Sequence, residues 1–182
     1  MKKMKITKFL LVMFLVITAV SCNKDDDGGE VAYTLSTTNF VDTYSMNFLE
    51  LKVVETVTLG SGSTTTETTT TKGSSFSNVN FVFNSDKTFN ASGLYISIVK
   101  TVNSNGTTTS DPTPADASTE IGSGIYSLNT SSNNVTITDG NGRVIVFEVR
   151  NYTETSMTLY AEETETVGNT TLETTIEYRF TR

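Results

Sequence analysis

The chain has 182 residues, enough for one domain, with 13 basic and 20 acidic residues and a formal net charge of −7. Because nucleic acid repels an acidic chain, this balance argues against DNA or RNA as a partner. The chain has no histidine, no tryptophan and one cysteine, which excludes Ser-His and Cys-His catalytic pairs, an internal disulfide and an imidazole ligand for zinc. We therefore expect no enzyme, no cofactor and no metal site.

Residues 1–21 have the pattern of a secretion signal. Four lysines lie within the first eight residues, and the stretch from Phe9 to Val20 is apolar apart from Thr18. An apolar run of this length is too short to cross a bilayer core of about 30 Å as a helix, whereas a basic start and a short apolar stretch are typical of a signal peptide. Without residues 1–21 the chain keeps nine basic and 20 acidic residues, so its net charge becomes −11.

The single cysteine, Cys22, directly follows this segment. Residues 19–22, Ala-Val-Ser-Cys, resemble the lipobox of bacterial lipoproteins, whose cysteine receives a diacylglycerol thioether and an acyl chain on its new amino group. That family prefers leucine where this chain has Ala19. Because burial of an acyl chain contributes about 0.8 kcal/mol per CH₂ group, several chains on Cys22 should anchor the protein durably to a membrane.

Residues 22–30 are expected to form an acidic, flexible tether. Residues 23–29 contain no apolar side chain and end in two glycines. The acidic run resembles the surface-export signal of lipoproteins from the Bacteroidetes group, and it consists of Lys24, Asp25, Asp26 and Asp27. This resemblance implies an outer-membrane protein that faces the cell exterior; the alternative is that the run is only a soluble spacer.

From residue 31 onward, apolar and polar residues alternate with the period of a β-strand, and no window keeps the spacing of a helix. The alternating sets are Leu49–Leu59, Val79–Phe83, Phe89–Tyr95, Val135–Ile137, Ile145–Val149, Met157–Ala161 and Ile176–Phe180. Short turns separate these sets, such as Asp-Gly-Asn-Gly at residues 139–142, which favours the positive φ angles of a tight hairpin. About eight to ten strands joined in this way predict that residues 31–182 form an antiparallel up-and-down meander. We expect this meander to close into a barrel, because closure removes exposed edges.

Threonine-rich segments follow three glycine-containing turns, at residues 64–71, 107–109 and 170–175. Threonine is β-branched and polar, so it favours a strand that is not buried on both faces. These segments predict long hairpins that reach into solvent. An adhesive or glycan-bearing rim is the alternative.

Both prolines, Pro112 and Pro114, lie between Asp111 and Thr119, the longest stretch without alternation. Connecting segments of this kind run over the surface of a domain, and long ones often carry function. We expect a loop over one end of the sheet. This loop is either a plain connection or a lid over a ligand site.

Two carboxylates could still perform acid–base chemistry without histidine. Glu50, Glu55 and Glu148 lie in or near expected strands, but nothing in their spacing brings two of them together over a substrate. Alternation points Glu148 outward, and Glu55 interrupts an apolar face, which indicates a bulge or a rim position. The chain is therefore expected to bind rather than to catalyse.

Several short patterns resemble the lipocalin-like domain of Bacteroidetes lipoproteins. They are residues 83–89, Gly93-Leu94-Tyr95, Gly124-Ile125-Tyr126, residues 135–139 and residues 178–182. The resemblance covers most of residues 49–182 and implies an up-and-down barrel of about eight strands with an internal cavity for a small apolar ligand. The chain departs from true lipocalins in lacking their tryptophan near the first strand. Independently of any family, a glycine inside a strand allows curvature and lets an aromatic ring cover its backbone.

Seven aromatic side chains share the inward parity of their strands, which makes them the candidate ligand pocket. They are Phe81, Phe83, Phe89, Tyr95, Tyr126, Phe147 and Tyr178. Two functions follow from this arrangement: a lipid-anchored binding module that holds a small apolar ligand inside the barrel, or a surface interaction protein with a filled barrel whose rim loops contact another macromolecule. A barrel of about eight strands allows both outcomes.

Overall fold

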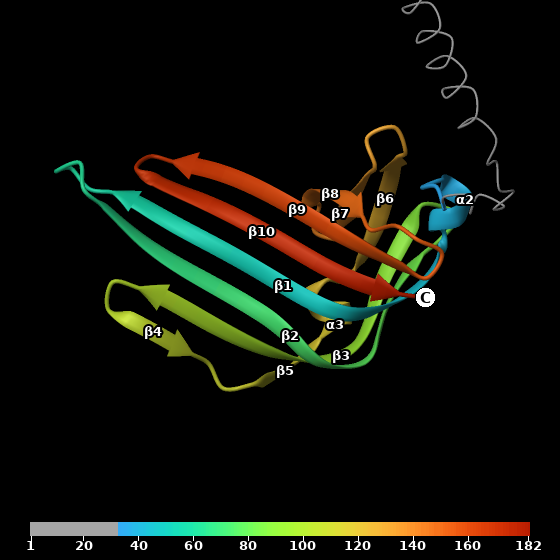
Figure 1. Cartoon of the computed structure of the whole chain (residues 1–182), viewed down its shortest axis with the longest axis horizontal. Coiled ribbons are helices and arrows are strands. Elements are labelled where there is room, and N and C mark those ends of the chain that lie inside the picture. Colours follow the sequence, from blue (N-terminus) through green and yellow to red (C-terminus); the bar gives the residue numbers. More distant parts are fainter. Residues whose placement is uncertain (1–32) are drawn as a thin grey trace, which may run out of the picture. The chain divides into compact units, whose positions relative to one another are not determined.

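The computed structural model describes residues 33–182, which form ten strands and two four-residue helices (Figure 1). The expected lipidation site Cys22 and the acidic run at residues 24–27 lie outside the described residues. The helices are α2 (Thr37–Phe40) and α3 (Ala117–Glu120), each too short to show a periodic pattern in the sequence. Within residues 33–182 no helix has the length and apolar character needed to cross a bilayer.

The strands form a closed ring of eight, with two further strands outside it. In chain order they are β1 (Asp42–Thr58), β2 (Thr64–Phe83), β3 (Thr88–Asn103), β4 (Gly106–Thr109), β5 (Thr113–Asp116), β6 (Ser123–Asn129), β7 (Asn134–Asp139), β8 (Val144–Arg150), β9 (Ser156–Val167) and β10 (Thr170–Thr181). Every pairing is antiparallel, and the ring runs β1-β2-β3-β6-β7-β8-β9-β10 and back to β1. Strands β4 and β5 each pair with β3 outside the ring. The predicted antiparallel meander that closes into a lipocalin-like barrel is confirmed.

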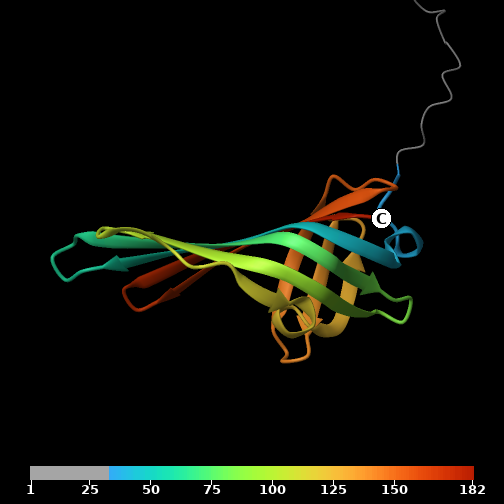
Figure 2. The same cartoon turned by 90° about the horizontal axis from the view of Figure 1, so that it is seen from below.

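The longest strands continue well beyond the ring. Strand β8 pairs with β9 at only three positions, and β6 pairs with β3 at only three. Past these points β9, β10, β1, β2, β3 and β4 lie side by side as a sheet that leaves the barrel (Figures 1 and 2). We call this sheet, with the turns at its tips, the extension; it comprises residues 51–72, 98–109 and 162–175. All three threonine-rich segments lie in it, because a strand with solvent on both faces needs a polar residue that still favours the extended backbone.

Aromatic side chains fill one end of the barrel. Phe40, at the end of α2, is fully buried, and its ring centroid lies 4.7 Å from that of Phe83 and 5.6 Å from that of Tyr126. The rings of Phe83 and Tyr126 meet edge to face at 5.2 Å, a favourable geometry for aromatic pairs. Together with Tyr44 these residues form what we call the aromatic plug. The plug closes the barrel at the end where α2 lies.

Arg182 fastens the chain over the outside of this plug. Its guanidinium donates hydrogen bonds to the hydroxyls of Tyr33, at 2.6 Å, and Tyr152, at 3.1 Å, and to the hydroxyl of Tyr44. Asp42 completes the set with an ion pair of 3.4 Å. Because these partners come from three separate segments, the one before α2, strand β1 and the connection between β8 and β9, one side chain holds the start and the end of the barrel together.

The two Gly-x-Tyr patterns mark points where backbones approach closely. Gly93 has φ +100°, and a Cβ atom there would lie 2.1 Å from the carbonyl oxygen of Asn78, beside an irregularity in the pairing of β2 with β3. At Gly124 a Cβ atom would lie 2.0 Å from the carbonyl oxygen of Thr138, and the ring of Phe89 lies close by. Only glycine fits either position without displacing its neighbours.

The expectation that residues 111–119 form an irregular loop is wrong. Residues 113–116 form β5, which pairs with residues 94–97 of β3, and α3 follows directly. Pro114 is compatible with this strand because β5 lies at an edge, where a missing N–H group costs no pairing. The carboxylate of Asp116 accepts a hydrogen bond of 2.8 Å from the backbone N–H of Ser118 and thereby caps α3.

Truncation of the plug should cost much of the domain's stability. We expect Phe83→Ala to lower the free energy of unfolding by about 3–5 kcal/mol, because it leaves a cavity in close-packed aromatic surroundings. The control is Ile125→Thr on the outer face of β6, where the side chain is 58% exposed and a change within about 0.5 kcal/mol is expected. Urea unfolding of both variants checks this, and equal losses would contradict a solid plug.

Candidate functional site

A cavity of about 510 Å³ occupies the barrel farther along the same strands, away from the aromatic plug. Its apolar walls are Leu49 and Leu51 of β1, Val99 of β3, Ile145 of β8 and Ile176 of β10. Strand alternation sends these side chains inward, since they continue the buried parity of each strand. The cavity therefore lies where the barrel opens onto the extension.

One wall of this cavity is the segment after β4 that was expected to be a loop. Thr113, Pro114 and Ala115 of β5 line the cavity, followed by Glu120 and Ile121 around the end of α3. Ala117 fixes the segment, because its side chain is fully buried in the core. The segment lies beside the cavity and is hydrogen-bonded to β3 as a strand, and the choice between a plain connection and a lid stays a prediction.

A gap of about 60 Å³ adjoins the larger cavity on its inner side. The two share a set of lining residues, namely Glu120, Ile121, Arg143, Ile145 and Tyr178. The gap is bounded by Phe81, Phe89 and Phe147, which are almost fully buried. The interior thus passes from the open cavity, through a narrow gap, into closely packed aromatic rings.

The structure distributes the seven predicted pocket residues over these three zones. Tyr95 and Tyr178 line the open cavity, while Phe81, Phe89, Phe147 and again Tyr178 border the narrow gap. Phe83 and Tyr126 line neither space and belong to the aromatic plug. The alternatives of a filled barrel and an open one are therefore both present, at different depths of one interior.

Two tyrosine hydroxyls face the cavity without a hydrogen-bond partner among residues 33–182. Tyr95 is only 6% exposed, and burial, together with the nearby carboxylate of Glu120, raises its pKa. Burial, reinforced by the proximity of Tyr95, raises the pKa of Tyr178 to about 12, although the positive charge of Arg143 acts in the opposite direction. Both phenols are neutral at physiological pH and remain available as hydrogen-bond donors.

Glu120 and Arg143 are the charged residues of the cavity lining. Arg143 belongs to the turn between β7 and β8, where Asp139 Oδ1 accepts hydrogen bonds of 2.9 Å from the backbone N–H groups of Asn141 and Arg143. Sequence reasoning missed Arg143 and Glu120, because strand parity says nothing about side chains in turns and short helices. The available signal for Arg143 was its position, directly after the Asp-Gly-Asn-Gly turn and directly before the apolar strand β8.

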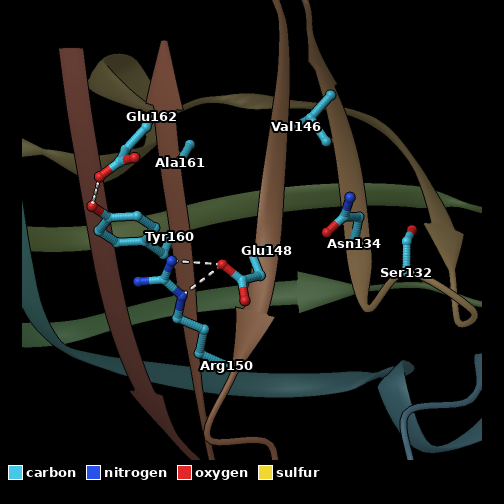
Figure 3. A pocket seen from close by; sticks show the side chains of 8 residues that line it. All are labelled: Ser132, Asn134, Val146, Glu148, Arg150, Tyr160, Ala161 and Glu162. Carbon is cyan, nitrogen blue, oxygen red and sulfur yellow. Dashed lines mark hydrogen bonds and ion pairs between the residues drawn. The ribbon is translucent and has the colours of Figure 1, made fainter. Parts of the chain in front are cut away.

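A second hollow, of about 310 Å³, lies on the outer wall where β8 and β9 diverge (Figure 3). Arg150 lies 3.6 Å above the ring centre of Tyr160 and binds Glu148 with N···O distances of 2.6 and 2.7 Å. The hydroxyl of Tyr160 donates to Glu162. Since these polar groups already bind one another, the interior cavity is the better candidate for a ligand site.

The carboxylates considered for catalysis lie in separate places. Glu50 forms an ion pair of 2.8 Å with Lys72, and Glu148 points outward as expected. Glu55 lies in the extension opposite Glu67 and Leu172 in regular register; the irregularity in β1 falls earlier, between Ser45 and Glu50. Across residues 33–182, no three His, Cys, Asp or Glu side chains gather as a metal-binding group.

Comparisons of the chain with protein families, with curated proteins and with solved structures give no match. The assignment of a site therefore depends on the geometry of the barrel itself. That geometry selects the interior cavity, because it brings apolar side chains, two tyrosine hydroxyls without a partner among residues 33–182, and the charges of Glu120 and Arg143 to one space.

Tyr178 should make stability depend on alkaline pH. Its pKa in the folded protein, about 12, lies above the ordinary 10.0, so the unfolded chain releases this proton first and stability is lost between pH 10.0 and about 12. Tyr178→Phe should lessen that loss. Urea unfolding at several pH values should give parallel curves for parent and variant below pH 10.0 and separate curves above it. Curves that stay parallel throughout would contradict the raised pKa.

Proposed function

We propose that the protein is a non-catalytic binding module that holds a small apolar ligand in the interior cavity. The observation that carries the proposal is a space of about 510 Å³ that remains open within a closed barrel whose other end is filled. Small-molecule sites typically have volumes of about 300–1,000 Å³, mostly apolar walls and a few polar groups. The cavity lies within this range of volume, and its lining combines apolar side chains with polar ones such as Thr71, Ser97 and Ser110.

The walls favour an apolar body for the ligand. Leu51, Val99 and Ile176 present side chains from three different strands to the same space, and burial of a ligand against them would release water from apolar surface. The continuous pairing of β10, β1, β2 and β3 holds these side chains in place without the ligand. A preformed site loses little conformational entropy on binding, which favours affinity.

Blocking the cavity should abolish binding of an apolar probe. Val99 and Val102 lie on opposite faces of β3, and only Val99 lines the cavity. We expect Val99→Trp to weaken binding of N-phenyl-1-naphthylamine by about tenfold or more, because an indole ring fills space the probe needs. Val102→Trp, the matched control, should bind as the parent does. Fluorescence titration measures both, and equal affinities for the two variants would contradict a site in this cavity.

We further propose that the domain is anchored through lipid on Cys22 and exposed outside the outer membrane by the acidic tether. The support is the lipobox-like ending of the signal segment and the acidic run behind it. An apolar ligand site on a tethered domain would retain a poorly soluble compound at the cell surface. The anchor and the cavity are independent parts of the proposal.

Replacement of the cysteine tests the anchor. Expressed with a labelled fatty acid in a Gram-negative host, the parent should be labelled and should sediment with membranes, whereas Cys22→Ala should be unlabelled and released. Several buried acyl chains account for the difference, since one chain alone binds only reversibly. Retention of both the label and the membrane association by Cys22→Ala would exclude anchoring at this residue.

The extension favours a second candidate function, contact with another macromolecule. It stands outside the barrel, and its tips expose Leu59, at 44%, and Val167, at 65%. Exposed apolar side chains at hairpin tips suit a surface interaction protein. If the parent protein binds no apolar probe, this second candidate becomes the better explanation of the fold.

A further inference from the structure

Among residues 33–182, Arg143 differs from the other arginines in having no ionic partner. Arg150 pairs with Glu148 at 2.6 Å, Arg179 with Glu177 at 2.5 Å and Arg182 with Asp42 at 3.4 Å. In residues 33–182 no carboxylate oxygen lies within 4.0 Å of a side-chain nitrogen of Arg143. Three of the four arginines in this acidic chain thus have a carboxylate, and the fourth lines the cavity.

In the part of the chain that the structure describes, the surroundings of Arg143 leave its guanidinium free for a ligand. The nearest acidic residue along the chain, Asp139, holds the β7–β8 turn by accepting two backbone hydrogen bonds. Glu120 lines the same opening but forms no ion pair with Arg143. A guanidinium always carries its charge and binds carboxylate groups well, so an unpaired one at a cavity mouth is suited to an anion.

Hydroxyl donors supplement this charge inside the cavity. Tyr178 lines both interior spaces together with Arg143, and the hydroxyl of Tyr95, which faces the cavity, has no protein acceptor among the described residues. The carboxylate of Glu120 contributes the opposite charge to the same mouth. A head group with one negative charge would gain Arg143 and a hydroxyl donor, whereas a second negative charge would face repulsion from Glu120.

Building on the proposed function, we infer that the ligand is an amphiphile with one carboxylate head group, bound with the head at Arg143 and Tyr178 and the apolar body against Leu51, Val99 and Ile176. The unpaired arginine, the free hydroxyls and the apolar walls then each have a part of the ligand to contact. Arg143 and Tyr178 also border the narrow gap toward Phe81 and Phe147, so the head group would lie next to the packed aromatic rings and the apolar body would extend away from them.

The test compares two probes that share their dansyl group and alkyl chain, 11-(dansylamino)undecanoic acid and its methyl ester, in which a methyl group replaces the negative charge of the head group. The parent should bind the acid about tenfold more tightly than the ester, the difference expected for one charge-assisted interaction. Arg143→Gln should remove that preference by weakening binding of the acid while leaving the ester unchanged. A dansyl-labelled alkyl phosphate of the same length should bind the parent less tightly than the acid.

The matched control is Arg150→Gln on the outer wall, which removes the same charge from the same part of the chain, outside the cavity (Figure 3). It should bind acid and ester as the parent does, and circular dichroism should show that both variants are folded. Equal affinities of the parent for acid and ester, or an equal loss in both variants, would overturn the role of Arg143 and leave the apolar site intact. Failure of the parent to bind either probe would overturn the proposed function as well.

Discussion

The packing of Phe40 against Phe83 and Tyr126 is the contact on which the rest of the structure depends. The only cysteine is at position 22, so the domain has no disulfide, and aromatic burial supplies the stabilisation that a small barrel needs. Because α2 provides Phe40 from outside the ring, one end can be packed solid without help from the other. The opposite half of the interior is therefore free to remain open.

Strand β3 pairs with β2 along one edge, and its other edge explains how the open half of the interior acquires its walls. Three short strands pair with that edge in succession: β6 at residues 88–90, β5 at residues 94–97 and β4 at residues 100–103. The barrel closes through the first of these, and β5 continues the edge where β6 leaves it. Strand β3 thus closes the ring through β6, holds the cavity wall through β5 and enters the extension beside β4.

Alternation in the sequence was enough to predict the ring, because a period of two reports directly which face of a strand is buried. It could not tell how deep along the barrel each residue lies. Phe83 and Tyr178 share the inward parity, yet one lies in the plug and the other lines the cavity, since depth depends on which strand ends α2 and β5 cover. Arg143, Glu120 and β5 escaped prediction because turns, a single helical turn and a four-residue strand with a proline carry no period.

The extension has a dynamic consequence for the cavity. A single layer of strands with water on both faces has no core of its own, so its backbone hydrogen bonds open by local fluctuations more readily than those around the plug. Strands β1 and β10 of the extension continue without a break into the cavity wall, to which they contribute Leu51 and Ile176. The cavity therefore lies on the boundary between a cooperative unit and a fraying one, and we expect amide hydrogen exchange to become faster along each strand from the plug to the extension.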